Sequence, residues 1–414
     1  MSLSDAEAAL PQRHTNTIPK GTEPTFQWNG SEGYITSPLL PSEPDPAFWE
    51  VLMADWGLSP ETTEVIDGSV NIRGWDANMG RDADGNATVQ RMKYYRAQIR
   101  RRTAGEKSHN IDKLCSEIIK RKKAKPAALV TGNRAFLILF SDWQLGKGEG
   151  GGPQATVERI CLAQDQIVER IKELRKAGRG PARIYIVGMG DLVEQCLGHY
   201  AMQTFQTVLT RREQKDLGIY LLDRMVELLV DAFPDLEIVL TAVPGNHGEN
   251  RNSSGKAFTD WLDNDDLDIF TSTYRCYLKN PERYARVSMP QFDGLVQEDL
   301  TITLDIAGVP TTFAHGHQFG KGNGGGTVAK IEAWWKGQVM GRTPVAESAI
   351  LFSGHYHHFV ASEGTGRQIF QCPAMDGGSK WFTSQTGANS PAGMLTVGVG
   401  LDYGQRGWGD LLII

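Results

Sequence analysis

Five apolar runs along the chain are each followed by a short polar motif. The runs are residues 136–140, 184–187, 238–243, 309–313 and 349–352. Each run has the length and the Val, Ile, Leu and Phe content of a buried strand. Residues 156–177 and 217–232 repeat apolar positions at spacings of three and four, which predicts helices between the strands. Strands that alternate with helices are typical of an α/β domain with parallel strands.

The motifs that follow these runs contain Asp, Asn, Gln and His. They read Asp142-Trp143-Gln144, Gly190-Asp191, Gly245-Asn246-His247, His315-Gly316-His317 and Gly354-His355-Tyr356-His357. The carboxyl ends of strands in an α/β sheet share one edge, so we expect these motifs to converge. Oxygen and nitrogen ligands without thiolate are typical of a site for Mn, Fe, Ni or Zn. They are not typical of a structural zinc site, which is rich in Cys. One such motif alone could be a polar loop start, but five together indicate a metal site.

On these motifs, the segment 136–372 resembles the calcineurin-like metallophosphoesterase superfamily. Within it, the chain is most similar to SbcD-type double-strand-break repair nucleases, in the version associated with phage genomes. The resemblance implies a two-layer or sandwich-like α/β core that holds two divalent metal ions. Manganese is the expected ion, with iron, nickel, zinc and magnesium as alternatives.

The resemblance also implies a role for each matching residue. Asp142, Gln144 and His357 would hold the first ion (the first centre), and Asn246, His315 and His355 the second (the second centre). Asp191 would bridge the two ions. His247 would act in catalysis without binding metal. Gln144 stands where the superfamily usually has His, and an amide oxygen is a weaker ligand than imidazole.

These roles agree with the chemistry of phosphoester hydrolysis. Two cations about 3.5–4 Å apart polarise phosphoryl oxygens and lower the pKa of a shared water. His247 could give a proton to the leaving oxygen. Lys147, Arg251 and Lys321 lie in or beside glycine-rich loops and are expected to bind substrate phosphates. The alternative for each is a solvated surface side chain.

Charge is distributed unevenly along the chain. The net charge is −6, yet residues 91–125 contain thirteen Lys or Arg against three Asp or Glu, a local net charge of +10. Basic residues near aromatic ones can bind nucleic acid, although such runs are often only solvated. The expected nucleic-acid-binding residues are Arg100, Arg101, Arg102, Lys120, Arg121, Lys122 and Lys123. The acidic run 263–268 is expected to be a solvated helix face.

Composition divides the chain into four parts. Residues 1–41 are rich in Pro, Ser, Thr and Gly and are expected to lack a fixed fold. The sequence of residues 42–102 predicts a small α+β module of unknown role, with a helix over 48–58 and a strand over 65–75. Residues 103–134 form a basic connector, and residues 135–414 form the catalytic domain.

The remaining features place the protein in an ordinary soluble class. Hydrophobic residues make up 40% and charged residues 22%. No apolar run has the length of a membrane span, so no membrane association is expected. The five cysteines are scattered without CxxC spacing, which favours free thiols and a cytoplasmic location, in the host if the chain is phage-encoded.

We therefore expect a metal-dependent hydrolase of phosphodiester bonds, a DNA endonuclease or exonuclease. DNA is the expected partner, and a partner ATPase or a homo-oligomer stays open. A phosphomonoesterase or cyclic-nucleotide phosphodiesterase for small substrates would use the same residues. A non-catalytic metal-binding scaffold is a third hypothesis, motivated by Gln144.

Overall fold

The protein is described by a computed structural model as two compact units, Met1–Ala104 and Gly105–Ile414. Placement is described for residues 25–28, 32–40, 47–58, 63–66, 69–81, 84–101, 111–200, 203–252, 254–257, 259–294, 300–320, 326–378 and 390–414. Each unit is described by itself below.

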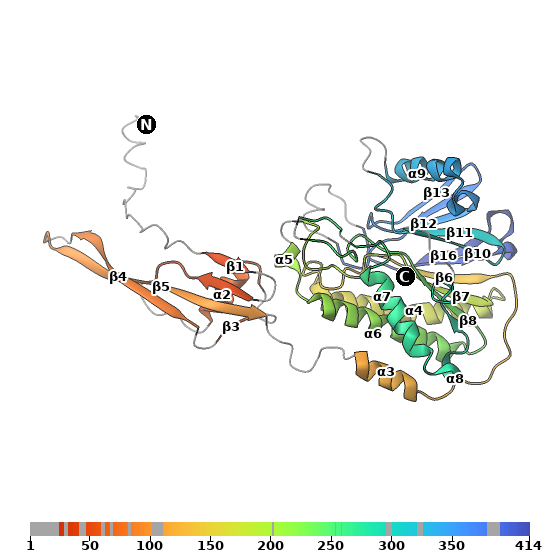
Figure 1. Cartoon of the computed structure of the whole chain (residues 1–414), viewed down its shortest axis with the longest axis horizontal. Coiled ribbons are helices and arrows are strands. Elements are labelled where there is room, and N and C mark those ends of the chain that lie inside the picture. Colours follow the sequence, from red (N-terminus) through yellow and green to blue (C-terminus); the bar gives the residue numbers. More distant parts are fainter. Residues whose placement is uncertain are drawn as a thin grey trace. The chain divides into compact units, whose positions relative to one another are not determined.

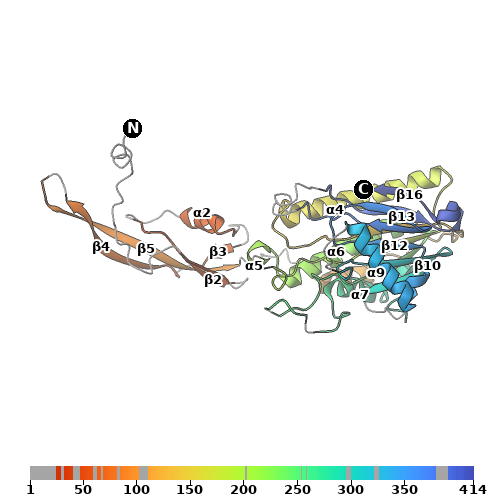
Figure 2. The ribbon, with the colours of Figure 1, turned by 90° about the horizontal axis from the view of Figure 1, so that it is seen from above.

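The first unit is a five-stranded antiparallel sheet with one helix. Its elements are β1 (Phe26–Trp28), β2 (Glu32–Thr36), α2 (Phe48–Asp55), β3 (Thr63–Val65), β4 (Asn71–Arg81) and β5 (Ala87–Arg101). Strands β4 and β5 form a long hairpin (Figures 1 and 2). Leu52 and Met53 of α2 pack with Ile35, Ala97 and Ile99 on one face of the sheet.

Three sequence expectations for this unit need correction. Residues 26–28 and 32–36 form strands, so the expectation of no fixed fold is wrong for them. They gain structure through pairing with distant residues, because β2 pairs with β5 from Glu32↔Arg100 onward. The predicted strand over 65–75 is two strands, since β3 ends at Val65 and β4 begins at Asn71, and the helix ends at Asp55 rather than at residue 58.

The second unit contains two sheets. The six-stranded sheet has the order β16 (Trp408–Ile413), β15 (Leu395–Val399), β6 (Ala135–Phe140), β7 (Arg183–Gly188), β8 (Glu237–Ala242) and β9 (Val287–Ser288). Strands β6 to β9 are parallel, and β15 and β16 form an antiparallel edge. The five-stranded sheet has the order β10 (Thr301–Ile306), β11 (Val309–Ala314), β12 (Ile350–Ser353), β14 (Arg367–Gln371) and β13 (Val360–Gly364). Its three central strands, β11, β12 and β14, are parallel.

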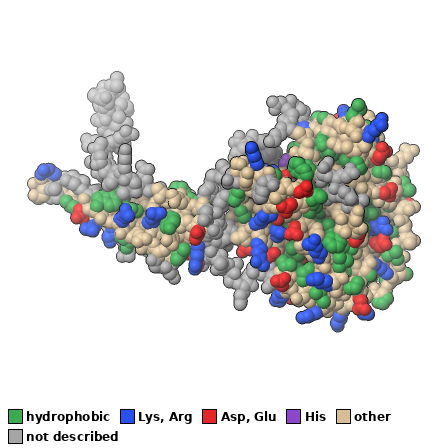
Figure 3. Space-filling model, in the orientation of Figure 1, with side chains coloured by type: hydrophobic (Ala, Val, Ile, Leu, Met, Phe, Trp, Pro, Cys, Tyr) green, Lys and Arg blue, Asp and Glu red, His purple; other side chains and the backbone are tan. Residues whose placement is uncertain are grey.

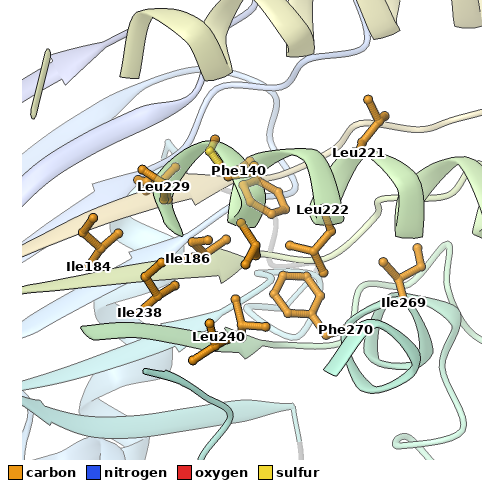
Figure 4. Packing of buried hydrophobic residues seen from close by; sticks show 14 of the residues in the cluster. Phe140, Ile184, Ile186, Leu221, Leu222, Leu229, Ile238, Leu240, Ile269 and Phe270 are labelled. Carbon is orange, nitrogen blue, oxygen red and sulfur yellow. The ribbon is translucent and has the colours of Figure 1, made fainter. Parts of the chain in front are cut away.

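The two sheets pack face to face, and helices cover their outer faces (Figure 1). Buried residues of both sheets, such as Leu137, Val187, Phe313 and Phe352, form one inner core. A second core lies between the six-stranded sheet and helices α3 (Ile111–Lys120), α4 (Gly152–Lys176), α6 (Arg211–Ala232) and α7 (Asp265–Tyr277). Figure 4 shows this layer, in which side chains of β6, β7 and β8 meet those of α6 and α7. Helix α9 (Thr327–Gly341) covers the five-stranded sheet. The predicted sandwich-like α/β core is confirmed.

Short helices complete the unit: α5 (Gln203–Gln206), α8 (Pro281–Tyr284), η1 (Pro344–Glu347) and η2 (Leu401–Arg406). The two long helices begin earlier than the apolar pattern predicted. Helix α4 starts at Gly152, and α6 starts at Arg211 after a capping box between Thr210 and Glu213. Among the described helices, none is long and apolar enough to cross a membrane.

A disulfide joins α3 to α7. Cys115 and Cys276 are bonded across a sequence separation of 161 residues, with Cα atoms 5.4 Å apart. The expectation that every cysteine is a free thiol is therefore wrong for this pair. Among the described residues, Cys161, Cys196 and Cys372 take part in no disulfide.

Candidate metal centre

The five polar motifs meet at one edge of the two sheets. Each lies directly after the carboxyl end of a parallel strand: β6, β7 and β8 in one sheet, and β11 and β12 in the other. Backbone hydrogen bonds tie the loops together. The Asp142 N–H donates to the Gly190 carbonyl (3.0 Å), and the Gly354 N–H donates to the His315 carbonyl (2.7 Å). The Met375 N–H donates to the Asp142 carbonyl (3.2 Å), which links the two sheets.

Three motif glycines allow the loops to approach this closely. A Cβ on Gly190 would lie 2.7 Å from His315 Nδ1, and one on Gly245 would lie 2.2 Å from Asp191 Oδ1. A Cβ on Gly354 would lie 1.9 Å from Ser141 Oγ. Any larger residue would therefore push the ligand-bearing loops apart.

Several proposed ligands adopt the left-handed backbone conformation that non-glycine residues rarely take. The φ angles are 51° for Asp142, 43° for Gln144, 54° for Asp191, 71° for His355 and 59° for His357. Such conformations persist where the surroundings impose them, and they cluster at functional sites.

The second centre is assembled from three elements. One ligand atom from each of Asp191, His315 and His355 can be chosen so that all lie within 4.8 Å of one another. Asp191 Oδ2 is 3.0 Å from His315 Nε2, and both side chains are almost fully buried. His315 Nδ1 is 2.7 Å from the Met189 carbonyl, and this contact orients Nε2 toward the centre. Carboxylate oxygen and imidazole nitrogen at this spacing fit a divalent ion.

Asn246 belongs to the same region. The residues on either side of it contact Asp191, since Gly245 packs on the carboxylate and the His247 N–H donates to Asp191 Oδ1 (2.7 Å). Asn246 Oδ1 is buried without a hydrogen-bond partner. Buried polar atoms rarely stay unsatisfied, so this oxygen is a good candidate for a metal ligand.

Charges within the second centre shift the ionisation of its members. Burial raises the pKa of Asp191, but His315 and His247 outweigh that effect and hold the pKa below its usual value. Burial and the neighbouring His315 lower the pKa of His355 to about 4. Both groups are therefore deprotonated at neutral pH, as metal ligands must be.

The first centre is arranged differently. Asp142 Oδ1 is 3.1 Å from His357 Nε2, so these two predicted ligands meet. Burial raises the pKa of Asp142, but His357 outweighs it and lowers the pKa to about 2. Gln144 Oε1 instead accepts a hydrogen bond from Lys147 Nζ (3.0 Å). Within the described residues, Asp142 and His357 belong to no group of three close His, Cys, Asp or Glu ligands.

Asp376 is a site residue that the sequence did not reveal. It follows β14, the strand next to β12, and its side chain is 2% exposed. Its carboxylate forms an ion pair with Lys147 and lies 3.6 Å from His357 Nδ1. The only available signal was its place shortly after a strand-like segment, as for the five motifs.

His247 is held beside the second centre by Glu194. Its Nδ1 lies 3.0 Å from the Glu194 carbonyl oxygen and 3.5 Å from Glu194 Oε2. Its ring stacks on His199 with centroids 4.1 Å apart. Tyr200 donates a hydrogen bond to Glu194 Oε1 (2.6 Å). With Nδ1 engaged in this way, Nε2 remains for proton transfer.

The predicted phosphate-binding residues have different outcomes. Lys147 lies in the site, and its side chain is only 11% exposed. Arg251 forms an ion pair with Glu249 (2.8 Å), and Glu249 is 4.0 Å from His317 Nε2. His317 lies near His315 and His355, and burial lowers its pKa to about 3. Lys321 lies outside the described residues.

The acidic run 263–268 is not a solvated helix face throughout, which corrects the sequence expectation. Asp266 is fully buried at the start of α7. It accepts hydrogen bonds from the backbone N–H groups of Asp191 (2.9 Å), Leu192 (2.8 Å) and Gly245 (2.9 Å). Burial and the charge of Asp191 raise its pKa to about 7, while the backbone donors oppose that rise. Asp266 therefore fixes the two loops that carry Asp191 and Asn246.

We expect Asp266→Ala to loosen both loops. Each buried N–H left without an acceptor costs roughly 1–3 kcal/mol, so the free energy of unfolding should fall by on the order of 3 kcal/mol or more. Urea unfolding followed by circular dichroism measures this change, and manganese titration should show weaker binding. Asp268→Ala, on the same helix with a 41% exposed side chain, is the control and should change little. Equal stability of Asp266→Ala and the parent would contradict the role of Asp266.

The basic stretch is divided between the two units. Arg100 lies on β5 and pairs with Glu64 (2.8 Å). Arg121 follows α3 and binds Asp223 (2.8 Å) and Tyr284 (2.9 Å), so it serves the fold of the second unit. Lys123 pairs with Glu282, while Lys120 and Lys122 are exposed. Arg101 ends β5, and Arg102 lies outside the described residues.

Comparisons with known proteins return only distant structural likeness. Vacuolar protein sorting 29 from Cryptosporidium parvum is 12% identical over 65% of this chain and 87% of its own, with a TM-score of 0.28. An archaeal phosphodiesterase is 9% identical over 67% and 99%, with a TM-score of 0.28. Phosphopantetheinyl hydrolase from Mycobacterium tuberculosis is 12% identical over 63% and 95%, with a TM-score of 0.26. The sequence matches no protein-family model and no curated protein. Likeness at this level does not decide the chemistry, which depends on the residues of the site itself.

Proposed function

We propose that this protein is a metal-dependent hydrolase of phosphoester bonds. The observation that carries the proposal is the buried group of Asp191, His315 and His355, with the unsatisfied Oδ1 of Asn246 beside it. A divalent ion bound there would polarise a phosphoryl oxygen and lower the pKa of a water molecule. Manganese is the ion we would test first, because the ligands are a mixture of oxygen and imidazole nitrogen without thiolate.

The chain's own residues would supply the remaining steps. His247 Nε2 would donate a proton to the leaving oxygen, because Nδ1 is engaged by Glu194. Glu194, with its side chain 1% exposed, would hold the ring in place. Lys147 is positioned to interact with a substrate oxygen through the third N–H of its ammonium group, since Gln144 and Asp376 engage only two.

We further propose nucleic acid as the substrate, on the basis of one face of the first unit. Ala97 and Ile99 of β5 pack with α2 and Tyr95 is also buried, so the alternating residues Tyr94 and Arg96 lie on the opposite face. We call this opposite face the outer face. Its basic and aromatic side chains include Tyr34, Arg73, Trp75, Tyr94 and Arg96.

Contacts on the outer face combine positive charge with aromatic rings. The Arg96 guanidinium lies 4.3 Å from the centre of the Tyr34 ring. Trp75 and Tyr94 have ring centroids 6.4 Å apart, and Arg73 is opposite Tyr94 across the strands. Figure 3 shows Lys and Arg side chains beside hydrophobic ones on the visible side of this unit. Flat sheet faces with this composition bind single-stranded nucleic acid by stacking and by phosphate charge.

The test is binding of a fluorescent single-stranded oligonucleotide at several salt concentrations. The variant Tyr34→Ala/Arg73→Ala/Arg96→Ala should bind at least about tenfold more weakly, because one lost base stack alone is worth roughly 1–3 kcal/mol. Its dependence on salt should also flatten, since fewer counterions are released. Hydrolysis of a small chromogenic phosphodiester should not change, because the metal ligands are intact.

Arg212→Ala is the matched control, since Arg212 is an 85% exposed arginine on α6 of the other unit. It should bind the oligonucleotide as the parent does. If the parent fails to bind at low salt while it still cleaves the chromogenic substrate, the substrate is a small phosphoester. If neither substrate is cleaved but metal is bound, the hypothesis of a non-catalytic metal-binding scaffold replaces that of a hydrolase.

A further inference from the structure

The first centre contains a lysine where a divalent ion would be expected. Lys147 Nζ is 3.0 Å from Gln144 Oε1, the atom that would have to bind the first ion. The same Nζ forms an ion pair with Asp376, whose side chain is 2% exposed. The Lys147 side chain is itself only 11% exposed, so the ammonium group is held inside the site and not at its rim.

The surroundings of Lys147 are built to hold this positive charge. The backbone N–H of Lys147 donates to the Gln144 carbonyl (3.0 Å). The backbone of Lys147 also forms an isolated antiparallel β-bridge with Thr207. These contacts fix the backbone from which the side chain extends. Asp376 is in turn positioned by the Gly378 N–H, which donates to its Oδ1 (3.0 Å). Asp376, the charged partner of the ammonium group, is therefore fixed by a contact of its own.

The remaining residues of the first centre are too few for an ion. Without Gln144, the predicted ligands are Asp142, His357 and the bridging Asp191. In the described part of the chain, the three do not come close enough together to form a ligand group. A divalent ion bound to Gln144 Oε1 would also lie close to the Lys147 ammonium, and like charges at short range repel strongly in a buried site.

We infer that the ammonium group of Lys147 occupies the first centre in place of a divalent ion, and that the chain binds one divalent ion, at the second centre. This inference rests on the proposed function and refines its metal requirement. Lys147 then supplies the second positive charge of the site as a fixed part of the chain. A preorganised charge of this kind can stabilise the negative charge that develops on a transferred phosphoryl group.

Metal content and electron paramagnetic resonance test the inference without measuring activity. The parent, loaded with Mn²⁺ and freed of excess by gel filtration, should contain one ion per chain and give the spectrum of an isolated Mn²⁺. Lys147→Ala/Gln144→His removes the ammonium group and restores an imidazole ligand. This variant should contain two ions per chain, with the spectrum of a magnetically coupled pair.

Two further variants show whether loss of the Lys147 ammonium group is what admits the second ion. Gln144→His alone should keep one ion, because Lys147 remains. Lys336→Ala removes a 79% exposed lysine on α9 and should also keep one ion. If the double variant does not fold, Lys147→Met/Gln144→His keeps the apolar stem of the lysine and takes its place.

Each outcome bears on the inference. Two ions in the parent, or two in Gln144→His alone, would show that Lys147 does not exclude a metal. A folded double variant that holds only one ion would also overturn the inference. A parent that binds no divalent ion would overturn both the inference and the proposed function. A parent that binds two ions would overturn the inference alone, so the two failures can be told apart.

Discussion

Asp191→Asn is expected to remove most bound metal and nearly all activity. Asp191 is the one predicted ligand shared by both centres, and its carboxylate lies 3.0 Å from His315 Nε2. The amide is neutral and keeps an oxygen that can accept the 2.7 Å hydrogen bond from the His247 N–H, so the loop should stay folded. Turnover should fall with the metal content, because the ion supplies the charge that would polarise the phosphoryl oxygen. Metal analysis beside hydrolysis of a chromogenic phosphodiester measures both effects.

Asp165→Asn is the control for this change. Asp165 is 56% exposed on α4, pairs with Arg224 of α6 and is no predicted ligand. It should retain the metal content and the turnover of the parent. An Asp191→Asn protein that is active and fully loaded with metal would rule out Asp191 as a ligand.

His247→Ala should have the opposite pattern, with metal retained and turnover lowered by roughly 10²–10⁴-fold, the range for a lost general acid. The metal should stay because His247 contacts Asp191 through its backbone N–H, which the variant keeps. The loss should be smaller with a nitrophenyl leaving group, which departs without a proton. Steady-state kinetics on substrates with good and poor leaving groups would measure the difference.

His358→Ala is the matched histidine control, since the His358 ring contacts the Tyr356 carbonyl and His358 is not itself a predicted ligand. It should have the turnover of the parent on both substrates. Metal loss in His247→Ala would make His247 a ligand, and an equal effect on both substrates would exclude its role as an acid.

The sequence predicted the convergence of the motifs because that information is local. Each apolar run ends in its own polar motif, and parallel strands bring such ends together, as for Asp142 after β6 and His315 after β11. The sequence also shows the motif glycines at 190, 245 and 354. Only the structure shows why glycine is needed there, since a side chain would collide with the neighbouring loop.

Residues whose role depends on distant partners could not be predicted. Asp266 binds backbone groups up to 75 residues away, and nothing in its acidic neighbourhood distinguishes it from a solvated residue. Asp376 acts through Lys147, 229 residues before it. The pairing of Cys115 with Cys276 depends on how α3 packs on α7, which no cysteine spacing reveals. The strands at 26–28 and 32–36 likewise depend on distant residues, because β1 pairs with β2 and β2 pairs with β5.

The order of the site residues along the chain has a consequence for synthesis on the ribosome. Asp191 follows β7, early in the second unit, while His355 follows β12, much later in the chain. A nascent chain that ends before β12 therefore has strands and helices but no complete ligand set. Because metal affinity depends on a preformed site, capture of the ion would occur only after both sheets have been made. The ion would then add its binding free energy to the finished fold alone, and not to shorter intermediates.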